Sequence, residues 1–128
     1  MNNMKNTVQT VKAPAAIGPY AQAWVAGNML FTSGQLGLDP VTNTLPETIE
    51  AQTLQSLDNI LAIVEEAGFQ KTDIVKTTVF VKDLADFALV NQLYAGFFGD
   101  HKPARSCVEV ARLPKDALIE IEVIAQRD

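Results

Sequence analysis

Near its C-terminal end the chain alternates apolar and acidic side chains, and this pattern constrains the fold more than any other. Ile119, Ile121 and Val123 stand at every second position, and Glu120 and Glu122 lie between them. A period of two predicts a β-strand with one apolar and one polar face. A slip of one residue would bury the carboxylates, which is far too costly in free energy. The pattern therefore predicts a sheet that other elements cover on one face only.

Two segments carry apolar residues at the three- and four-residue spacing of an amphipathic helix. Gly68 supplies a stop for the first helix and Gly99 for the second, and Asp83 or Asp86 can cap the start of the second. The apolar stripes are Leu54, Leu57, Ile60, Leu61, Val64 and Ala67 in the first, and Val90, Leu93, Tyr94 and Phe97 in the second.

The dipeptide Gly27-Asn28 separates two short β-prone runs, residues 20–26 and 29–33. Because both turn residues tolerate positive φ, the pattern predicts a tight hairpin. In this register Trp24 faces Phe31. The small and β-branched residues of the hairpin then point toward the helices. The side chains on the other face are Tyr20, Gln22, Trp24, Phe31, Ser33 and Gln35.

A second hairpin is predicted from residues 105–112 and 117–126, which flank the turn formers of residues 113–116. The polar side chains of both arms would then lie on the helix-free face. The expected cross-strand pairs are Arg105 with Ile124, Cys107 with Glu122, and Glu109 with Glu120, with Val108 and Val110 turned toward the helices.

The predicted order of elements is β-ββ-α-β-α-ββ, with a first short strand near residues 7–12 and a strand over residues 74–82 between the helices. Right-handed crossovers would bring both helices to the same face. The fold class is therefore α+β, a mixed β-sheet with two helices packed on one face, in a single domain over residues 1–128. The residues expected on one face of the middle strand are Val75, Thr77, Val79 and Val81.

The charge balance, the hydropathy and the cysteine content exclude or disfavour several classes of protein. Ten Lys and Arg residues against fifteen Asp and Glu residues give a net charge of −5, without a basic run, which disfavours nucleic acid as the main partner. No apolar run approaches the ~20 residues of a membrane span, and the first residues lack a signal sequence, so we expect a cytoplasmic protein. Cys107 is the single cysteine, which excludes an internal disulfide and argues against a zinc site.

Large apolar side chains gather on the predicted helix-free face, and such faces are usually covered by a partner. We expect a homo-oligomer with clefts between its subunits, and sedimentation of a stable monomer at micromolar concentration would contradict this. The side chains concerned are Trp24, Phe31, Phe80, Leu118 and Ile124.

Several separated motifs occur in order along the chain. They are AAIGPYAQ at residues 15–22, TSGQ at 32–35, IVKTTVFVKD at 74–83, PARSCVEVARLPKD at 103–116 and IEIE at 119–122. Together they resemble the YjgF/reactive-intermediate deaminase family, most closely its RidA subgroup, from about residue 13 to residue 125. The resemblance implies a chorismate-mutase-like α+β fold, a homotrimer and a site in each cleft between subunits. It also implies hydrolysis of 2-imino or enamine acids, such as 2-iminobutanoate and 2-iminopropanoate, to 2-keto acids and ammonia, with neither cofactor nor metal.

Arg105 and Glu120 are the catalytic residues that the resemblance implies. A planar guanidinium holds a substrate carboxylate through two parallel hydrogen bonds, and a carboxylate can deprotonate water or carry a proton to the departing nitrogen. Repulsion from Glu122 favours a proton on one of the two acids. From the residues alone, Arg105 could instead form an ion pair with Glu109 or Glu122, and Glu120 could belong to a solvated face.

The resemblance implies three further substrate-binding residues. Tyr20 would form an aromatic wall of the pocket, Ser33 would supply a hydroxyl, and Gly34 would let the backbone approach the ligand closely. It adds Asn91 as a further lining residue. By composition alone, Tyr20 equally suits an interface aromatic and Ser33 a strand end, and an exposed helix position is the ordinary explanation of Asn91.

The resemblance implies that Cys107 binds substrate through its backbone, and the residues themselves argue against a nucleophile. A thiolate needs an activating base or cation, and the only histidine, His101, lies in a loop without a paired acid. The loop of residues 99–102 is shorter than is usual in the family, and Lys102 stands where an aromatic residue normally borders the pocket.

The sequence is compatible with two other functions. A non-catalytic sensor of 2-keto acids would need the same Arg105. An endoribonuclease or translation inhibitor is disfavoured by the acidic charge and the solitary His101.

Overall fold

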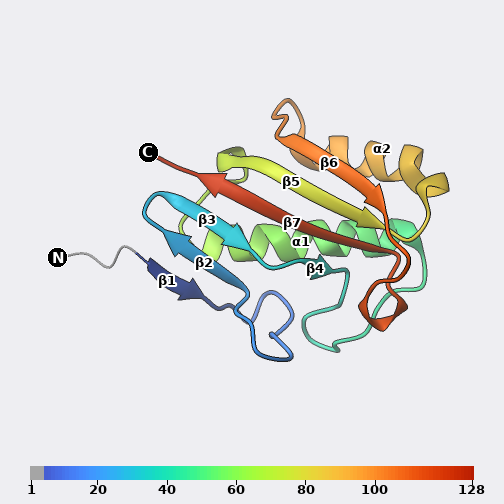
Figure 1. Ribbon diagram of the computed structural model, residues 1–128, viewed down its shortest axis with the longest axis horizontal. Helices are drawn as coiled ribbons and strands as arrows, with labels where there is room; N and C mark the ends of the chain where they lie inside the picture. Colours follow the sequence, from blue (N-terminus) through green and yellow to red (C-terminus); the bar gives the residue numbers. More distant parts are fainter. Residues whose placement is uncertain (1–4) are drawn as a thin grey trace.

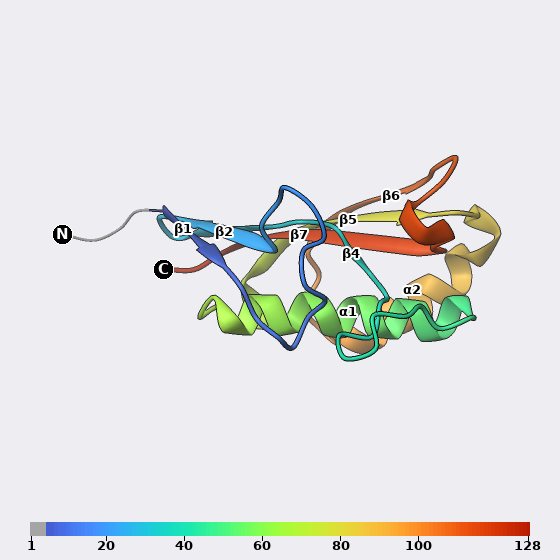
Figure 2. The same cartoon turned by 90° about the horizontal axis from the view of Figure 1, so that it is seen from below.

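The computed structural model describes residues 5–128 as one mixed sheet with both helices on the same face (Figure 1, Figure 2). The hydrogen-bonded strand order is β1-β2-β3-β7-β5-β6, and β4 also pairs with β7. The elements are β1 (Lys5–Val8), β2 (Ala23–Ala26), β3 (Met29–Thr32), β4 (Gln35–Leu36), α1 (Ile49–Glu66), β5 (Ile74–Val81), α2 (Phe87–Phe98), β6 (Ala104–Glu109) and β7 (Ile119–Gln126), with 3-10 turns at Lys71–Asp73, Leu84–Asp86 and Pro114–Asp116. The predicted class and order are confirmed, with β4 as an additional strand and the first strand at residues 5–8.

Strand β7 lies between β3 and β5 in the sheet, and its two faces differ as the alternating pattern predicts. Ile119, Ile121 and Val123 are buried against the helices together with residues of α1. Glu120 and Glu122 therefore point to the opposite, helix-free face, where each is half-buried. The face assignment of this strand is confirmed.

The first hairpin also has the predicted register. Gly27 adopts a φ of 61° in the turn, and Trp24 pairs with Phe31. The backbone N–H of Ser33 donates to the carbonyl of Gln22 at 2.9 Å. Leu30, on the other face, is fully buried beneath the sheet.

The predicted C-terminal hairpin is wrong. Strand β6 lies at the edge of the sheet and pairs in parallel with β5, while β7 pairs with the other side of β5 (Figure 1). The helix α2 connects β5 to β6, and a β-α-β crossover returns the chain parallel to the strand it left. The observed partners of Arg105, Cys107 and Glu109 are Thr77, Val79 and Val81, and those of Ile124, Glu122 and Glu120 are Lys76, Thr78 and Phe80.

With this pairing, the side chains of Arg105, Cys107 and Glu109 lie on the face opposite to the predicted one. Cross-strand partners share a face, and Thr77 points toward α2, where its hydroxyl lies 2.7 Å from the Tyr94 hydroxyl. Arg105 pairs with Thr77 and therefore points toward α2 as well. Val108, expected beneath the helices, is 43% exposed. The sequence of β6 carries polar and apolar residues on both faces, so its alternation alone could not orient it.

Strand β5 departs from the prediction at its first residues. Val75 is exposed, whereas Ile74 is fully buried. The register shifts between Ile74 and Lys76, so Val75 is the extra residue of a β-bulge that changes the parity of the strand. From Thr77 onward the prediction is confirmed, because Thr77, Val79 and Val81 share one face of the strand and all three are buried.

Helix α1 buries polar as well as apolar residues. Leu57, Ile60 and Val64 lie in the core as predicted, but Leu54 is 45% exposed. Near that end of the helix the buried face is polar, because side chains there bind the carbonyls of the chain around β4. Ser56 Oγ donates to the Gln35 carbonyl at 2.7 Å, and Asn59 Nδ2 donates to the Leu36 and Leu38 carbonyls at 3.0 and 2.9 Å.

The N-terminal cap of the second helix is divided between the two candidate residues. Asp83 accepts from the backbone N–H of Ala85 at 2.9 Å and caps the preceding 3-10 turn. Asp86 occupies the N-cap position of α2 without a side-chain hydrogen bond. Gly99 ends the helix with a φ of 63°, as predicted.

Gly37 lies directly against the backbone of α1, which leads to a stability prediction. A Cβ atom at residue 37 would lie 2.7 Å from the Cα of Gln52, and neither backbone can give way easily. We expect Gly37→Ala to lower the free energy of unfolding by about 2–3 kcal/mol in urea denaturation. Gly96→Ala is the control, because a Cβ there meets nothing within 4 Å and alanine favours the helix. Equal stability of the two variants would contradict this packing.

Candidate active site

The predicted site residues form two groups on opposite faces of the sheet. Arg105, Cys107 and Asn91 lie on the helix side, next to α2. Glu120 and Gly34 lie together on the helix-free side. The expectation that Arg105 and Glu120 share one face within a subunit is therefore wrong, and its cause is the parallel pairing of β6.

Arg105 is held by groups that leave its charge uncompensated. Its Nη1 donates to Asn91 Oδ1 at 2.7 Å, and its guanidinium carbon lies 4.8 Å from the Tyr94 ring centroid and 5.6 Å from that of Phe87. These are cation–π distances, which orient the guanidinium without neutralising it. Within residues 5–128 no carboxylate lies within 4.0 Å of Arg105, so the alternative of a structural ion pair is not realised. Such an arginine is suited to receiving the carboxylate of a ligand.

A cavity of about 400 Å³ lies beside this guanidinium, and we call it the Arg105 cavity. Its lining residues are Asn91, Tyr94, Ala95, Phe98, Gly99, His101, Lys102, Pro103 and Arg105. The volume is in the range of small-molecule sites.

The Cys107 thiol is poorly suited to nucleophilic attack. Burial raises its pKa, and the neighbouring Arg105 only partly opposes this effect. His101 Nε2 donates to the Ile74 carbonyl at 2.6 Å, and within residues 5–128 no hydrogen bond joins His101 to Cys107. The expectation that Cys107 is not a nucleophile is consistent with this geometry.

Glu120 is the titratable group of the opposite face. Burial raises its pKa above the usual value, and the charge of Glu122 raises it further, in the direction that the sequence predicted. A Cβ added to Gly34 would lie 2.8 Å from both the Cδ and the Oε2 of Glu120. The glycine therefore makes room for the carboxyl group. A carboxyl with a raised pKa, half-buried in a cavity, is suited to proton transfer.

A second cavity, of about 250 Å³, contains this carboxyl group, and we call it the Glu120 cavity. Tyr20 forms part of its wall, and the Tyr20 hydroxyl accepts from the backbone N–H of Ile17 at 3.3 Å. Ser33 lines neither cavity, and its hydroxyl donates to the Ala21 carbonyl at 2.6 Å. In this structure Ser33 anchors the end of the strand through this bond.

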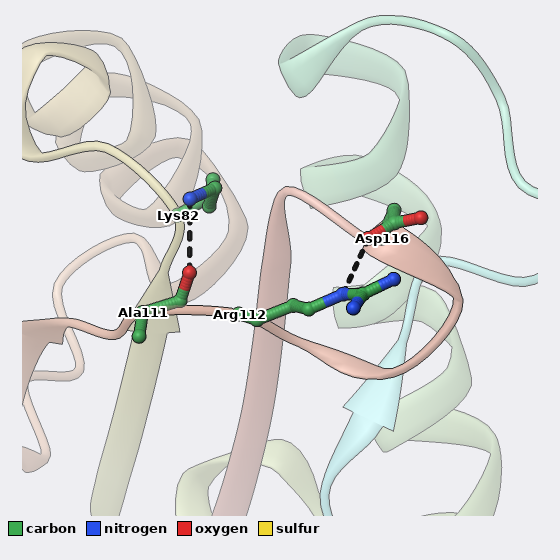
Figure 3. A network of polar contacts seen from close by, with 4 residues as sticks. All are labelled: Lys82, Ala111, Arg112 and Asp116. Atoms are coloured by element: carbon green, nitrogen blue, oxygen red, sulfur yellow. Dashed lines mark hydrogen bonds and ion pairs between the residues drawn. The ribbon is translucent and has the colours of Figure 1, made fainter.

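Sequence reasoning missed Lys115, which lines the Glu120 cavity. Lys115 and Asp116 adopt φ values of 59° and 55° in the turn before β7. Figure 3 shows how this loop is held: Arg112 Nε donates to Asp116 Oδ1 at 2.8 Å, and Lys82 Nζ donates to the Ala111 carbonyl at 2.9 Å. The turn formers of residues 113–116 are the sequence signal for this loop, but they do not show that it borders a cavity.

Sequence reasoning also missed the aromatic side chains that contact the Arg105 guanidinium. Phe87, Asn91 and Tyr94 recur at four- and three-residue spacing and so share one face of α2. That spacing was visible in the sequence. Only the position of β6 shows that this face contacts Arg105.

The described part of the chain offers neither a metal cluster nor a membrane-spanning helix. Across residues 5–128 no three His, Cys, Asp or Glu side chains come together in a way that could hold a metal ion. Within the same range, every helix is too short or too polar to cross a bilayer.

Comparisons with known proteins agree on one family. The sequence model of the family described as endoribonuclease L-PSP matches residues 10–127. The chain is 61% identical over 127 residues to the 2-iminobutanoate/2-iminopropanoate deaminase of Escherichia coli strain K12, covering 97% of this chain and 99% of that protein.

Two solved structures from E. coli extend the similarity to the fold. The crystal structure of the YjgF gene product has a TM-score of 0.93 and 60% identity, with 96% of this chain and 99% of that one covered. The structure of TdcF with bound serine has a TM-score of 0.94 and 49% identity, with the same coverage.

Proposed function

The chain belongs to the endoribonuclease L-PSP family, that of the YjgF/RidA proteins, and on this premise we propose that it is an imine deaminase. It hydrolyses reactive 2-imino and enamine acids, such as 2-iminobutanoate and 2-iminopropanoate, to 2-keto acids and ammonia. We place this reaction in the cytoplasm and treat residues 1–128 as a single domain. The observation that carries the mechanism is the uncompensated Arg105 guanidinium, a receptor for the carboxylate that all these substrates share.

The active site combines two subunits. Arg105 and Glu120 point to opposite faces of the same sheet, so a site that uses both must take them from different copies of the chain. We propose a homotrimer in which Arg105 of one subunit meets Glu120 of its neighbour. The helix-free face supports this assembly, because Trp24 and Phe31 are 47% and 43% exposed there in the isolated subunit. A second copy would remove these aromatic rings from water.

The chemistry follows from the two charges. Arg105 holds the substrate carboxylate and thereby fixes the position of the neighbouring C=N carbon. Glu120 takes a proton from water, the water oxygen bonds to that carbon, and the C=N electron pair moves to the nitrogen. Glu120 then gives its proton to the nitrogen. It next takes the proton of the new hydroxyl as the C=O bond forms and the C–N bond breaks, and passes that proton to the departing nitrogen, which leaves as ammonia. The sum is imine plus water to keto acid plus ammonia, and an enamine enters after tautomerising to the imine.

Two supporting groups complete the proposed site. Asn91 fixes the guanidinium through its bond to Nη1. The backbone at Cys107, two residues along the same strand, holds the imine nitrogen. That TdcF has been crystallised with serine supports a site shaped for a small amino acid skeleton.

RNA cleavage, the activity in the name of the matched family, is not our proposal. The net charge is −5 and the sequence pI is about 4.7, so phosphate backbones are repelled overall. His101, the only histidine, is bound to a backbone carbonyl. Within residues 5–128 it has no acidic partner within 4.0 Å.

A subunit-mixing experiment tests the composite site. Arg105→Ala and Glu120→Gln proteins, each inactive alone, are unfolded together and refolded at equal amounts. In a random mixed trimer about a quarter of the sites combine an intact Arg105 with an intact Glu120. We therefore expect recovery of about a quarter of the wild-type rate, measured as keto-acid release from an imine that an amino-acid dehydratase generates in situ.

The control is the same mixture without the unfolding step, which should stay inactive as long as subunits do not exchange. Absence of recovery after refolding, with trimers present, would show that the site lies within one subunit. A wild-type protein that binds 2-ketobutyrate but does not accelerate imine loss would be a sensor instead of an enzyme.

A further inference from the structure

The Arg105 cavity has a charge that the proposed reaction does not require. Arg105 and Lys102 both line it, together with the chain's only histidine, His101. Among the described residues that line the cavity none is acidic, although acidic residues outnumber basic ones in the whole chain. A substrate with one carboxylate uses Arg105 alone, so Lys102 is a second, unused cation.

Lys102 is also uncommitted within the subunit. Three other lysines are bound: Lys71 donates to the Phe97 carbonyl, Lys76 to the Ser106 hydroxyl, and Lys82 to the Ala111 carbonyl. Lys102 is exposed and, within residues 5–128, takes part in neither a side-chain hydrogen bond nor an ion pair. Its ammonium group is free to bind a ligand.

The end of α2 beside the cavity does not cancel this positive charge. A helix C-terminus carries partial negative charge on its last carbonyls, which disfavours anions. Here the Phe97 carbonyl accepts from Lys71 Nζ at 2.7 Å, and the Phe98 carbonyl accepts from the backbone N–H of His101 at 3.2 Å. These bonds partly neutralise the helix end, so the two cations set the sign of the potential in the cavity.

The spacing of the two cations fits a short ligand with two anionic ends. Residues 102 and 105 are three positions apart, so their Cα atoms lie at most about 10 Å from each other, and both side chains are long enough to converge from that distance. The cavity also has apolar walls from Phe98 and Pro103, which suit the methylene groups between two carboxylates.

We infer that this chain, given the imine deaminase activity proposed above, accepts dicarboxylic 2-imino acids, with Arg105 binding the 1-carboxylate and Lys102 the side-chain carboxylate. The class comprises the imines of aspartate and glutamate. The inference rests on the proposed function and deepens it by naming a substrate class, and its test changes Lys102 while Arg105 and Glu120 stay intact.

The experiment compares two substrates in three proteins. Imines of glutamate and of 2-aminobutyrate are generated in situ by amino-acid oxidases, and keto-acid release gives kcat/KM for each. In Lys102→Gln the ratio of the dicarboxylic to the monocarboxylic value is expected to fall about threefold to tenfold, which is the size of a partly exposed ion pair. Lys12→Gln removes the same charge from an exposed position outside the Arg105 cavity and should keep the wild-type ratio.

An unchanged ratio in Lys102→Gln, or an equal fall in Lys12→Gln, would overturn the inference. A binding measurement separates this failure from failure of the proposed function. Calorimetry with 2-ketoglutarate and 2-ketobutyrate should show the same loss of preference in Lys102→Gln even if the wild-type protein hydrolyses neither imine. That result would contradict the deaminase proposal and support the second anion site. If the wild-type protein does not prefer 2-ketoglutarate to 2-ketobutyrate, the second anion site is contradicted.

Discussion

Replacing Arg105 with alanine is expected to lower kcat/KM for imine hydrolysis by about 100- to 1000-fold. The variant loses two charge-assisted hydrogen bonds to the substrate carboxylate, each worth about 1.5–3 kcal/mol, part of which water regains. The variant should have a higher KM and a lower kcat, because binding of the substrate carboxylate by Arg105 also positions the carbon that water attacks. The measurement is the rate of keto-acid release over a range of imine concentrations.

Arg105→Lys separates charge from geometry. Lysine keeps the positive charge but not the planar fork that matches a carboxylate, so we expect partial activity, about tenfold or more below the wild type. It would also lose the bond that Arg105 Nη1 makes to Asn91. A lysine variant as active as the wild type would show that bidentate recognition is not needed. An active alanine variant would remove Arg105 from the mechanism.

Replacing Glu120 with glutamine is the second large effect, and it should act on kcat. Loss of a general base or acid lowers turnover by about 100- to 10,000-fold, whereas Arg105 still binds the substrate carboxylate. Binding of 2-ketobutyrate, measured by calorimetry, should therefore change much less than the rate of keto-acid release. A variant that loses binding and turnover in the same proportion would show that Glu120 acts in substrate binding instead.

The raised pKa of Glu120 sets the direction of the pH dependence. Glu120 must be ionised to take a proton from water, so the rate should fall as the pH drops through its pKa, which burial and Glu122 place above the usual range for a glutamate. Glu122→Gln removes the neighbouring charge and should move the acid limb of the kcat profile to lower pH. A limb that stays in place would assign it to another group.

The same shift gives a prediction for stability. The folded chain binds the Glu120 proton more tightly than the unfolded chain, so ionised Glu120 destabilises the fold. This penalty is complete above the folded-state pKa and disappears as the pH falls below the unfolded-state pKa. Glu120→Gln should therefore be at least as stable as the wild type at neutral pH, by thermal unfolding. Its loss of activity cannot then be explained by unfolding.

Much of the fold was readable because local patterns act over short distances. The alternation of Ile119, Ile121 and Val123 oriented β7, and Gly27-Asn28 set the register of the first hairpin. Both features depend on residues that are neighbours in sequence or face each other across a two-residue turn.

The predictions were wrong where contacts between segments distant in sequence determine which way a side chain or strand faces. Leu54 seemed a core residue by spacing, but polar contacts from α1 to the chain around β4 turned it outward. Val75 changed face through a bulge that a neighbouring strand defines. The strand that β6 would join, and in which direction, was not encoded in its own alternation.

The sequence by itself determined the identity of the chemical groups: a guanidinium at residue 105, a carboxyl at residue 120, and a strand pattern that keeps this carboxyl off the helix-covered face. Side-chain parity within a strand is a local property of the backbone, and residue type needs no fold. Only the tertiary structure decided that β5 lies between β6 and β7, because strand pairing depends on how α2 returns the chain to the sheet. That pairing separates the two groups by the thickness of the sheet, and for this reason the proposed site needs a second subunit.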